Sequence, residues 1–411
     1  MSITSYPEVV RLDGSAGGNG VTFAGPTTDA FGRLRVSTPL TFFDSQQRYK
    51  DNGYFDTSTT GGGSSTYLIN ESSVALAVGT TSGDQVIRQS KRCFPYQSGK
   101  SLLIFNSFVF AAGKTNLRQR IGSFTPTNGI FFELDGTTKN FVVRNYASGS
   151  VVENRIPQSS WNADKFDGTG PSGITLDTTK THILYTDIEW LGVGTVRMGF
   201  VIDGLLYICH RFNHANNVSS VYMTTASLPL RIEITNTGTT ASSSTMKQVC
   251  SSVMSEGGYE RKVAPSIARD TTSKSVSTTF TPLVSIRLAS DRLDAVILPS
   301  KYIALPISTG NFEIALFRNA TLTSASYNTT DFSNVDIDIA ATAMSGGTMI
   351  SNQYAASTNQ SASAASNNTE YNWDLQLGST IAGVSDIITL AARTLSGTDS
   401  IIGSLDFFDL T

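Results

Sequence analysis

The sequence predicts an all-β protein in which two antiparallel β-sandwiches follow an extended N-terminal segment. Strand-like runs recur along most of the chain, and Gly, Pro, Asn or Asp residues separate them. Of the 411 residues, 102 are Ser or Thr and 35 are Gly, a composition typical of short strands joined by many turns. No stretch carries an apolar stripe at helical spacing over a helical length, so a sandwich architecture is favoured.

Residues 1–50 differ from the rest because Gly and Pro interrupt them and no long periodic run occurs. We expect an extended anchoring arm that lies on a neighbouring subunit. Within it, residues 30–36 alternate apolar and basic side chains, which predicts a strand laid along a partner surface. The pair Phe42-Phe43 would place one ring outward for subunit contact, although burial of both rings between two layers fits equally well. The candidate assembly residues are Phe31, Arg33, Leu34, Arg35, Phe42 and Phe43.

Residues 51–262 are expected to form the larger sandwich. The clearest signal is a hairpin in which Asp203-Gly204 joins the runs 197–202 and 205–209, because Asp-Gly favours a type I′ turn. The long Gly-rich loop 161–173 predicts an ordered surface excursion pinned by Trp161 and Phe166. A sandwich with such loops resembles lectin-like folds of the jelly-roll or concanavalin type.

Residues 263–411 are expected to form a second, smaller sandwich. A change in composition around 257–277, to Gly, Pro and a Ser/Thr run, indicates an interdomain connection before the strand signals resume. The run 373–377 is among the predicted strands. Ala355–Asn368, which is almost wholly Ala, Ser, Thr, Asn and Gln, is expected to be a mobile exposed loop.

Composition argues against several classes of partner. The formal net charge is −3 and only 15% of residues are charged, so no basic field exists for nucleic acid or for an acidic membrane surface. No segment approaches the roughly 18 apolar residues of a membrane span, and the N-terminus lacks a signal-peptide pattern. Cys93, Cys209 and Cys250 match no disulfide or zinc pattern, so we expect synthesis in a reducing cytoplasm and a soluble product.

No convincing catalytic, cofactor or metal site is predicted. His210 and His214 have a spacing that converges on a metal only in a helix, whereas the preceding run predicts a strand. Gly99-Lys100-Ser101 resembles the end of a phosphate-binding loop, but Phe94 stands where that loop needs glycine, and a strand pattern follows where it needs a helix.

Three carboxylate couples occupy alternate strand positions, namely Glu133 and Asp135, Asp187 and Glu189, and Asp336 and Asp338. Members of each couple share a strand face, so each couple could act as a glycan-cleaving pair or hold Ca²⁺. A solvated strand face explains the same alternation and is the favoured interpretation. If a glycan or ion site exists, its candidate residues are Trp161, Asp187, Glu189 and Trp190.

Five sequence blocks, in the same order, resemble a family of virion structural proteins of tailed bacteriophages, notably marine ones and cyanophages. The blocks are residues 28–37 with 43–45, residues 96–101, residues 167–173, residues 189–194 and residues 210–216. The resemblance runs from the arm to about Glu260 and is looser in the C-terminal sandwich. It implies a virion component, such as a head decoration or fibre, or a neck, tail or baseplate protein, with no catalytic residues to carry over.

The resemblance and the residue patterns together predict a non-enzymatic part that assembles with copies of itself, as a trimer or another cyclic oligomer, and with capsid, neck or tail proteins of the virion. Two alternatives remain open. One is a carbohydrate-binding adsorption protein that recognises a host surface glycan, and the other is a glycan hydrolase that uses paired carboxylates.

Overall fold

The computed structural model describes residues 38–329, 333–358, 361–362, 365–368 and 373–411. For residues 361–362 and 365–368 it describes the backbone alone. The prediction of an all-β protein is confirmed: within these residues the only helical elements are two 3₁₀ turns, η1 (Gln158–Ser160) and η2 (Trp373–Leu375). Strand pairing is antiparallel throughout the described part of the chain. Phe31, Arg33, Leu34 and Arg35 lie outside the described residues.

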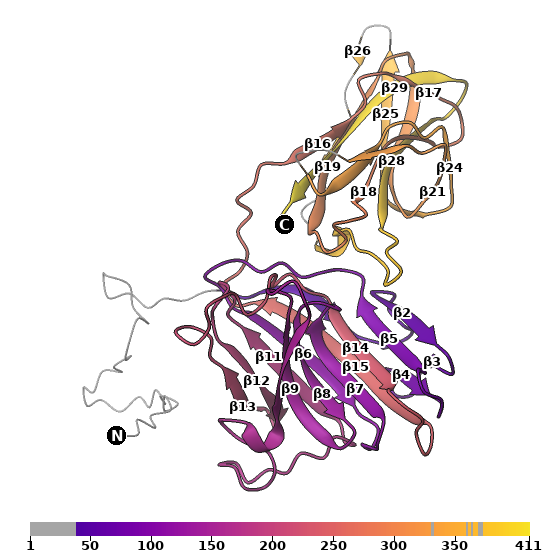
Figure 1. Cartoon of the computed structure of the whole chain (residues 1–411). Helices are drawn as coiled ribbons and strands as arrows, with labels where there is room; N and C mark the ends of the chain where they lie inside the picture. The colour runs from indigo at the N-terminus through magenta and orange to yellow at the C-terminus, as the bar shows by residue number, and fades with distance from the viewer. Residues whose placement is uncertain (1–37, 330–332, 359–360, 363–364, 369–372) are drawn as a thin grey trace, which may run out of the picture.

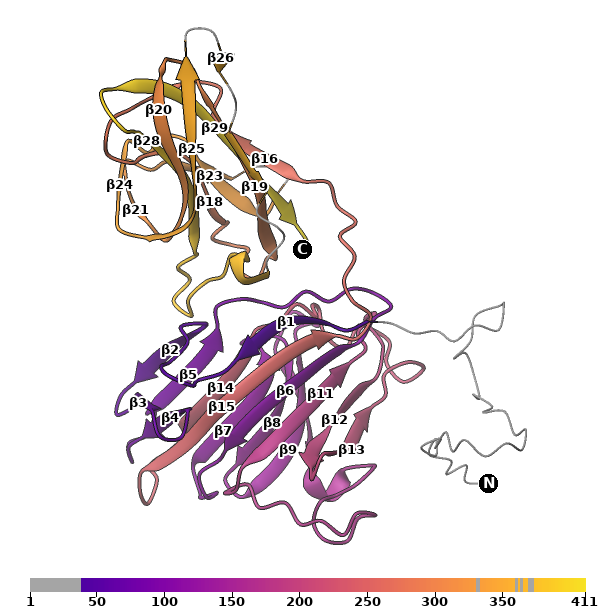
Figure 2. The ribbon, with the colours of Figure 1, turned by 180° about the vertical axis from the view of Figure 1, so that it is seen from behind.

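The first sandwich consists of an eight-stranded and a seven-stranded sheet packed face to face (Figures 1 and 2). The eight-stranded sheet has the order β13 (Leu205–Phe212), β12 (Val196–Ile202), β11 (His182–Ile188), β6 (Leu102–Val109), β15 (Ser244–Ser255), β4 (Ser73–Val78) and β3 (Ser64–Leu68), and β1 (Leu40–Ser45) also pairs with β15. The seven-stranded sheet has the order β10 (Val152–Pro157), β9 (Thr138–Asn145), β8 (Gly129–Asp135), β7 (Leu117–Phe124), β14 (Leu230–Asn236), β5 (Gln85–Ser90) and β2 (Phe55–Thr60).

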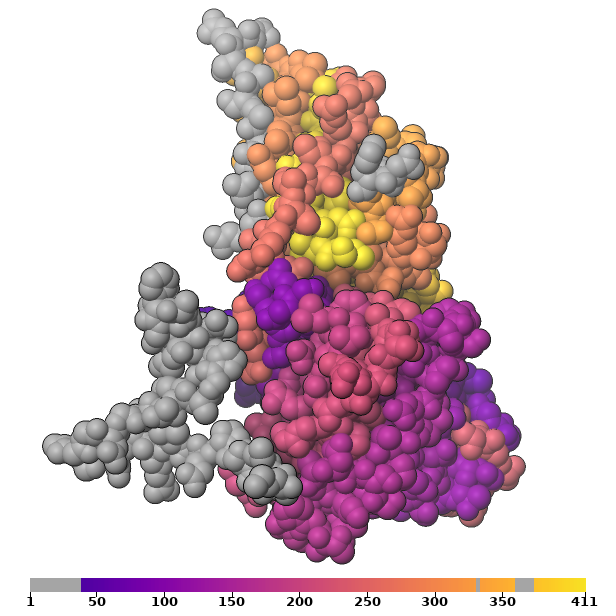
Figure 3. All heavy atoms as spheres, turned by 60° about the vertical axis from the view of Figure 1, so that its left-hand side comes forward, coloured from indigo at the N-terminus to yellow at the C-terminus, as the bar shows by residue number. Residues whose placement is uncertain are grey.

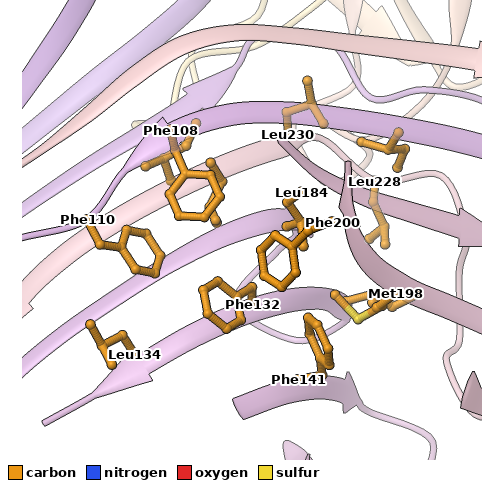
Figure 4. Close-up of a cluster of buried hydrophobic side chains, with 14 of the residues drawn as sticks. Phe108, Phe110, Phe132, Leu134, Phe141, Leu184, Met198, Phe200, Leu228 and Leu230 are labelled. Atoms are coloured by element: carbon orange, nitrogen blue, oxygen red, sulfur yellow. The ribbon is translucent and has the colours of Figure 1, made fainter. Parts of the chain in front are cut away.

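Aromatic side chains fill the space between these two sheets. Phe108 and Phe132, from opposite sheets, point toward each other, and Phe200 joins them edge-on at 5.4 Å from the Phe132 ring (Figure 4). All three rings are fully buried. Burial of each large apolar side chain stabilises the fold by roughly 1.5–3 kcal/mol, so this core holds the two sheets against each other.

The predicted hairpin and surface loop of the first sandwich are confirmed. Asp203 and Gly204 join β12 to β13 with φ values of 51° and 79°, the positive pair that a type I′ turn needs. In the loop 161–173, the Trp161 ring stacks on Phe141 at 4.2 Å and the Phe166 ring stacks on Phe200 at 5.9 Å. Both loop aromatics are buried, so they pin the excursion to the core.

The structure corrects the end of the expected arm. Residues 40–45 form β1, which pairs with β15 of the same chain and therefore belongs to the first sandwich. A register shift between Thr41 and Phe43 lets both neighbouring rings turn inward, and Phe42 and Phe43 are 3% and 2% exposed. Neither ring is therefore exposed for an assembly contact. Of the two interpretations that the sequence allowed, burial of both rings is the one that the structure shows.

The second sandwich has its own buried core, which is separate from that of the first. One sheet has the order β16 (Ser266–Arg269), β29 (Asp399–Asp409), β19 (Ile297–Pro306) and β27 (Ala365–Asn368), and β17 (Lys274–Val276) also pairs with β29. The other has the order β22 (Tyr327–Thr329), β23 (Val335–Asp338), β18 (Thr281–Leu288), β28 (Ile387–Thr394), β20 (Gly310–Arg318), β25 (Thr348–Thr358) and β26 (Ser361–Ala362), and a small ribbon pairs β21 (Thr321–Thr323) with β24 (Ala343–Ser345).

Two expectations for the second sandwich are wrong. The run 373–377 begins with the 3₁₀ turn η2 instead of a strand, because it turns toward the first sandwich and contacts it. Within 355–368, the described residues lie in β25, β26 and β27, where backbone pairing outweighs a composition that predicted a loop.

Residues 373–381 fasten the second sandwich to one end of the first, and Figure 3 shows the two bodies in contact there. Three hydrogen bonds to main-chain carbonyls contribute. The side chains of Arg92 and Gln376 donate, from Arg92 Nη1 to the Trp373 carbonyl at 2.5 Å and from Gln376 Nε2 to the Cys93 carbonyl at 2.7 Å, and Ser379 N donates to the Lys91 carbonyl at 2.7 Å. We call this contact, between residues 42, 56 and 91–93 of the first sandwich and residues 373–381, the joint.

Candidate functional site

A cavity of about 700 Å³ opens where β11, β12 and β13 meet the turn that precedes β6. Six charged side chains from these segments line it, three cationic and three acidic. They are Lys100, Asp187, Glu189, Arg197, Arg211 and Glu256. We call it the charged cavity. The structure therefore places Asp187 and Glu189, the favoured carboxylate couple of the sequence, in one solvent-open site.

Strand alternation explains why these side chains share a face. In β11, Leu184 and Ile188 belong to the buried core, so Asp187 projects from the opposite face of the sheet. Register then aligns the neighbours, because Asp187 lies opposite Arg197 of β12 and Arg197 lies opposite Arg211 of β13. The result is a cross-strand row of one carboxylate and two guanidinium groups.

Asp187 is the most buried carboxylate of the cavity and forms an ion pair with Arg197. Burial raises the pKa of the Asp187 carboxyl above its ordinary value, and the nearby charges of Glu256 and Glu189 act in the same direction. Arg197 opposes the rise through its charge and its hydrogen bond. The Arg197 cation thus holds the Asp187 carboxylate in place, while burial and the charges of Glu256 and Glu189 disfavour its ionised form.

The other two acids are fixed by turns at the cavity wall. Glu189 Oε2 accepts a hydrogen bond from Thr195 N at 3.2 Å, and Glu256 Oε2 accepts one from Ser101 Oγ at 3.2 Å. Gly194 permits the tight turn behind Glu189, because a Cβ atom at Gly194 would lie 2.4 Å from the Glu189 carbonyl oxygen. The sequence 189–194 therefore folds into the wall of the cavity.

The two tryptophans predicted for a glycan site are not in the charged cavity. Trp161 is 3% exposed and its ring stacks on Phe141 inside the core. Trp190 packs against the core and against Tyr96, and its indole Nε1 donates to the Met223 carbonyl at 3.2 Å. Both rings serve packing because their large apolar area is worth more buried than exposed. Of the four candidate residues for a glycan or ion site, the structure thus brings Asp187 and Glu189 together in the charged cavity, and neither Trp161 nor Trp190 lines it.

The remaining carboxylate couples are occupied in structural contacts. Glu133 is fully buried, contrary to a solvated face, and accepts hydrogen bonds from Arg120 Nε at 2.7 Å and Arg155 Nε at 2.9 Å. Asp336 pairs with Arg287 and Asp338 accepts main-chain N–H bonds from the turn at 340–341. Both Asp336 and Asp338 are buried, whereas Asp135, the partner of Glu133 in its couple, is exposed as a solvated face predicts.

The histidines serve packing and turn contacts. His214 is buried, bonds through Nδ1 to the Gly194 carbonyl at 2.6 Å, and its ring stacks on Tyr222 at 3.9 Å. His210 Nδ1 accepts a hydrogen bond from Asn162 N at 3.3 Å. Among the residues that the structure describes, no three His, Cys, Asp or Glu side chains converge as metal ligands, and no helix is long and apolar enough to cross a membrane.

Sequence reasoning missed the basic half of the cavity. In the sequence, Lys100 stands out only through the resemblance of residues 99–101 to a phosphate-binding loop, and the structure confirms that a strand, β6, follows it. Arg197 and Arg211 flank the Asp203-Gly204 hairpin, and a simple two-residue hairpin register would have opposed Arg197 to His210. A register shift between Met198 and Gly199 opposes it to Arg211 instead. The signal that could have revealed the bulge is Gly199, an isolated glycine inside the strand run, where a Cβ atom would clash with the Tyr207 carbonyl oxygen.

No family model and no curated protein matches the chain. Among solved structures, the catalytic domain of an endo-1,3-β-glucanase (laminarinase) from Thermotoga petrophila is 12% identical, with 56% of this chain and 100% of that chain covered and a TM-score of 0.36. A protein of unknown function from Shewanella oneidensis is 11% identical, with 60% and 100% covered and a TM-score of 0.36. The Emp47p carbohydrate recognition domain is 11% identical, with 52% and 91% covered and a TM-score of 0.31. Similarity this low carries no functional argument.

Proposed function

We propose that this protein is a non-enzymatic structural component of a tailed-phage virion, assembled as a homo-oligomer on the head, neck or tail and attached through its N-terminal residues. The five sequence blocks that resemble phage virion proteins suggest this role. The observation that supports it most directly is the joint, because a part of a particle must keep its domains in a fixed orientation under load.

The joint is built from contacts that resist sliding and hinging. Besides three bonds to carbonyl oxygens, Ile381 N donates to the Asp56 carboxylate at 2.8 Å. A Cβ atom at Gly378 would lie 2.5 Å from the Lys91 carbonyl oxygen, so the chain segments approach as closely as glycine allows. Multiple directional bonds fix the angle between two bodies more firmly than apolar contact alone, because hydrogen bonds weaken steeply when misaligned.

The charged cavity supports a non-enzymatic role as well. A retaining glycosidase needs one carboxylate free to attack the sugar, and an inverting one needs a carboxylate free to activate water. Asp187 is engaged by Arg197, and Glu256 by Ser101 Oγ. Glu189 keeps one oxygen free beyond its bond from Thr195 N, but it lacks the second free carboxyl group that either mechanism needs. We expect no release of reducing ends from a soluble β-1,3-glucan, and measurable turnover that is abolished by Glu189→Gln would contradict the proposal.

Removal of residues 1–37 tests the attachment role. The truncation ends before β1, because a deletion through residue 50 would remove a strand that pairs with β15 and would confuse attachment with folding. We expect the truncated protein to melt at the same temperature as the full chain but to be missing from purified virions. Sedimentation of the full chain should show a cyclic oligomer. Normal incorporation of the truncated protein, or a full chain that stays monomeric at high concentration, would overturn the proposal.

A further inference from the structure

We propose that the charged cavity binds an acidic oligosaccharide, that is, a polyhydroxylated chain that carries carboxylate groups. The proposal goes beyond virion assembly and does not depend on it, because it rests on the side chains of the cavity alone. A volume of about 700 Å³ lies within the range of ordinary small-ligand sites.

Lys100 and Arg211 provide the anion-binding groups. Of the six charged side chains, Asp187 pairs with Arg197, while Glu189 and Glu256 accept the hydrogen bonds described above. Among the residues that the structure describes, neither the Lys100 ammonium nor the Arg211 guanidinium makes a side-chain hydrogen bond or ion pair. Lys100 lies in the turn before β6 and Arg211 in β13, so these two cations provide two separate points at which carboxylates of a ligand can accept charge-assisted hydrogen bonds, in a cavity whose six charged side chains otherwise balance.

The acidic wall supplies acceptors for hydroxyl groups. Glu189 uses one carboxylate oxygen on Thr195 N, so its other oxygen remains able to accept from a ligand hydroxyl. The Asp187–Arg197 pair presents an acceptor and donors side by side, and Arg197 is about half exposed. A simple anion such as phosphate would use only the cations, whereas a sugar acid uses both sets of groups.

The site continues beyond Arg211, which favours an oligomer over a single sugar. A second cavity of about 330 Å³ shares Arg211 with the first and is lined mainly by apolar residues, including Pro171, Leu206 and Tyr207. Its one carboxylate, Asp164, accepts hydrogen bonds from Phe166 N and Ser172 N. Arg211 therefore stands between two adjoining cavities, where its planar guanidinium can bind a carboxylate with two parallel hydrogen bonds. The apolar lining of the second cavity suits the hydrophobic face of a sugar ring.

The test compares tri-galacturonate with its methyl ester, which keeps the sugar chain but removes the negative charges. We expect calorimetric binding of tri-galacturonate by the full-length protein that weakens as salt rises, and binding at least tenfold weaker for the ester. A hyaluronan tetrasaccharide, in which carboxylates alternate with neutral sugars, serves as a second acidic probe.

Variants then assign the binding to named cations. Lys100→Gln and Arg211→Gln should each weaken tri-galacturonate binding about tenfold, the usual scale of one charge-assisted hydrogen bond. Lys180→Gln is the matched control, because Lys180 is exposed at the other end of β11, and it should change nothing. Unchanged melting temperatures show that the variants fold. Equal binding of the methyl ester, unchanged binding by both cavity variants, or no binding of either acidic probe would each overturn the proposal.

Discussion

The rings of Phe42 and Trp373 meet edge-on, with centroids 4.6 Å apart, although 331 positions separate them in the sequence (373 − 42). Phe42 lies in β1 of the first sandwich, and Trp373 begins η2 of the second. Tyr259, from the segment that leaves the first sandwich, packs edge-on against the same Trp373 ring at 5.2 Å. One indole thus ties together the first strand, the connecting segment and the second sandwich.

Replacing Trp373 with alanine is therefore expected to loosen the joint. The change removes two aromatic pairs, each worth about 0.5–1.5 kcal/mol beyond its buried area, so we expect about 1–3 kcal/mol less coupling between the sandwiches. Calorimetry should show one unfolding transition split into two, one for each sandwich. Trp373→Phe, which keeps an edge-on ring, should preserve most of the coupling, and identical melting of the alanine variant would show that the joint does not depend on this ring.

Glu133 is expected to be the most sensitive carboxylate of the first sandwich. Its fully buried side chain bonds to Arg120 and Arg155, so Glu133→Gln deprives the buried Arg120 of its closest counter-charge. Arg120 keeps only longer ion pairs, to Glu233 at 3.5 Å and to Glu153 at 3.6 Å, while Arg155 keeps its pair with Glu153. We therefore expect a loss of about 3 kcal/mol, the lower end of the cost of breaking a buried pair. Urea unfolding measured by tryptophan emission checks this value.

The matched control for Glu133 is Glu71→Gln. Glu71 also pairs with a cation, Lys247, but its side chain is 50% exposed. We expect a loss below about 1 kcal/mol for this exposed pair. Similar losses for the two variants would mean that the burial of Glu133 does not matter.

Local patterns in the sequence predicted the parts of the fold that short-range physics decides. The Asp203-Gly204 turn is an example, since two positive φ values are a local property, and the loop pinned by Trp161 and Phe166 is another. No local pattern decides between burial and exposure of Phe42 and Phe43, because burial of both rings needs a bulge in β1 and the distant Trp373.

Of the charged cavity, only the acidic residues of β11 could be predicted, because local alternation places them and tertiary packing places the basic ones. Asp187 and Glu189 share a face by simple alternation, which a sequence reveals. Their basic counterparts come together through a register shift between β12 and β13 and through the placement of the Lys100 turn beside β11. Such long-range placement depends on tertiary packing, and Gly199, which marks the bulge, does not specify it.

His210 gives the first sandwich a pH-dependent stability. Burial lowers the pKa of His210 to about 4, below the unfolded value of about 6.5, so the unfolded state binds the proton more readily. The contribution of neutral His210 to the free energy of unfolding is fully present above about pH 6.5, and it is lost as pH falls toward the folded-state pKa of about 4. Melting temperatures of His210→Gln should therefore decline less than wild type between pH 7 and pH 4.5. Parallel pH profiles for the two proteins would contradict this assignment.

Trp161 separates a packing role from a ligand-binding role. Its ring is buried against Phe141 and its Nε1 donates to the Ile156 carbonyl at 3.1 Å, so Trp161→Ala should destabilise the first sandwich by about 3–5 kcal/mol. Trp161→Phe keeps a stacked ring and loses only the hydrogen bond and some area, so a smaller loss is expected. Because the ring does not reach the charged cavity, Trp161→Phe should bind tri-galacturonate as wild type does, measured by calorimetry below its melting temperature. Weakened binding by this folded variant would return Trp161 to the glycan site that the sequence suggested.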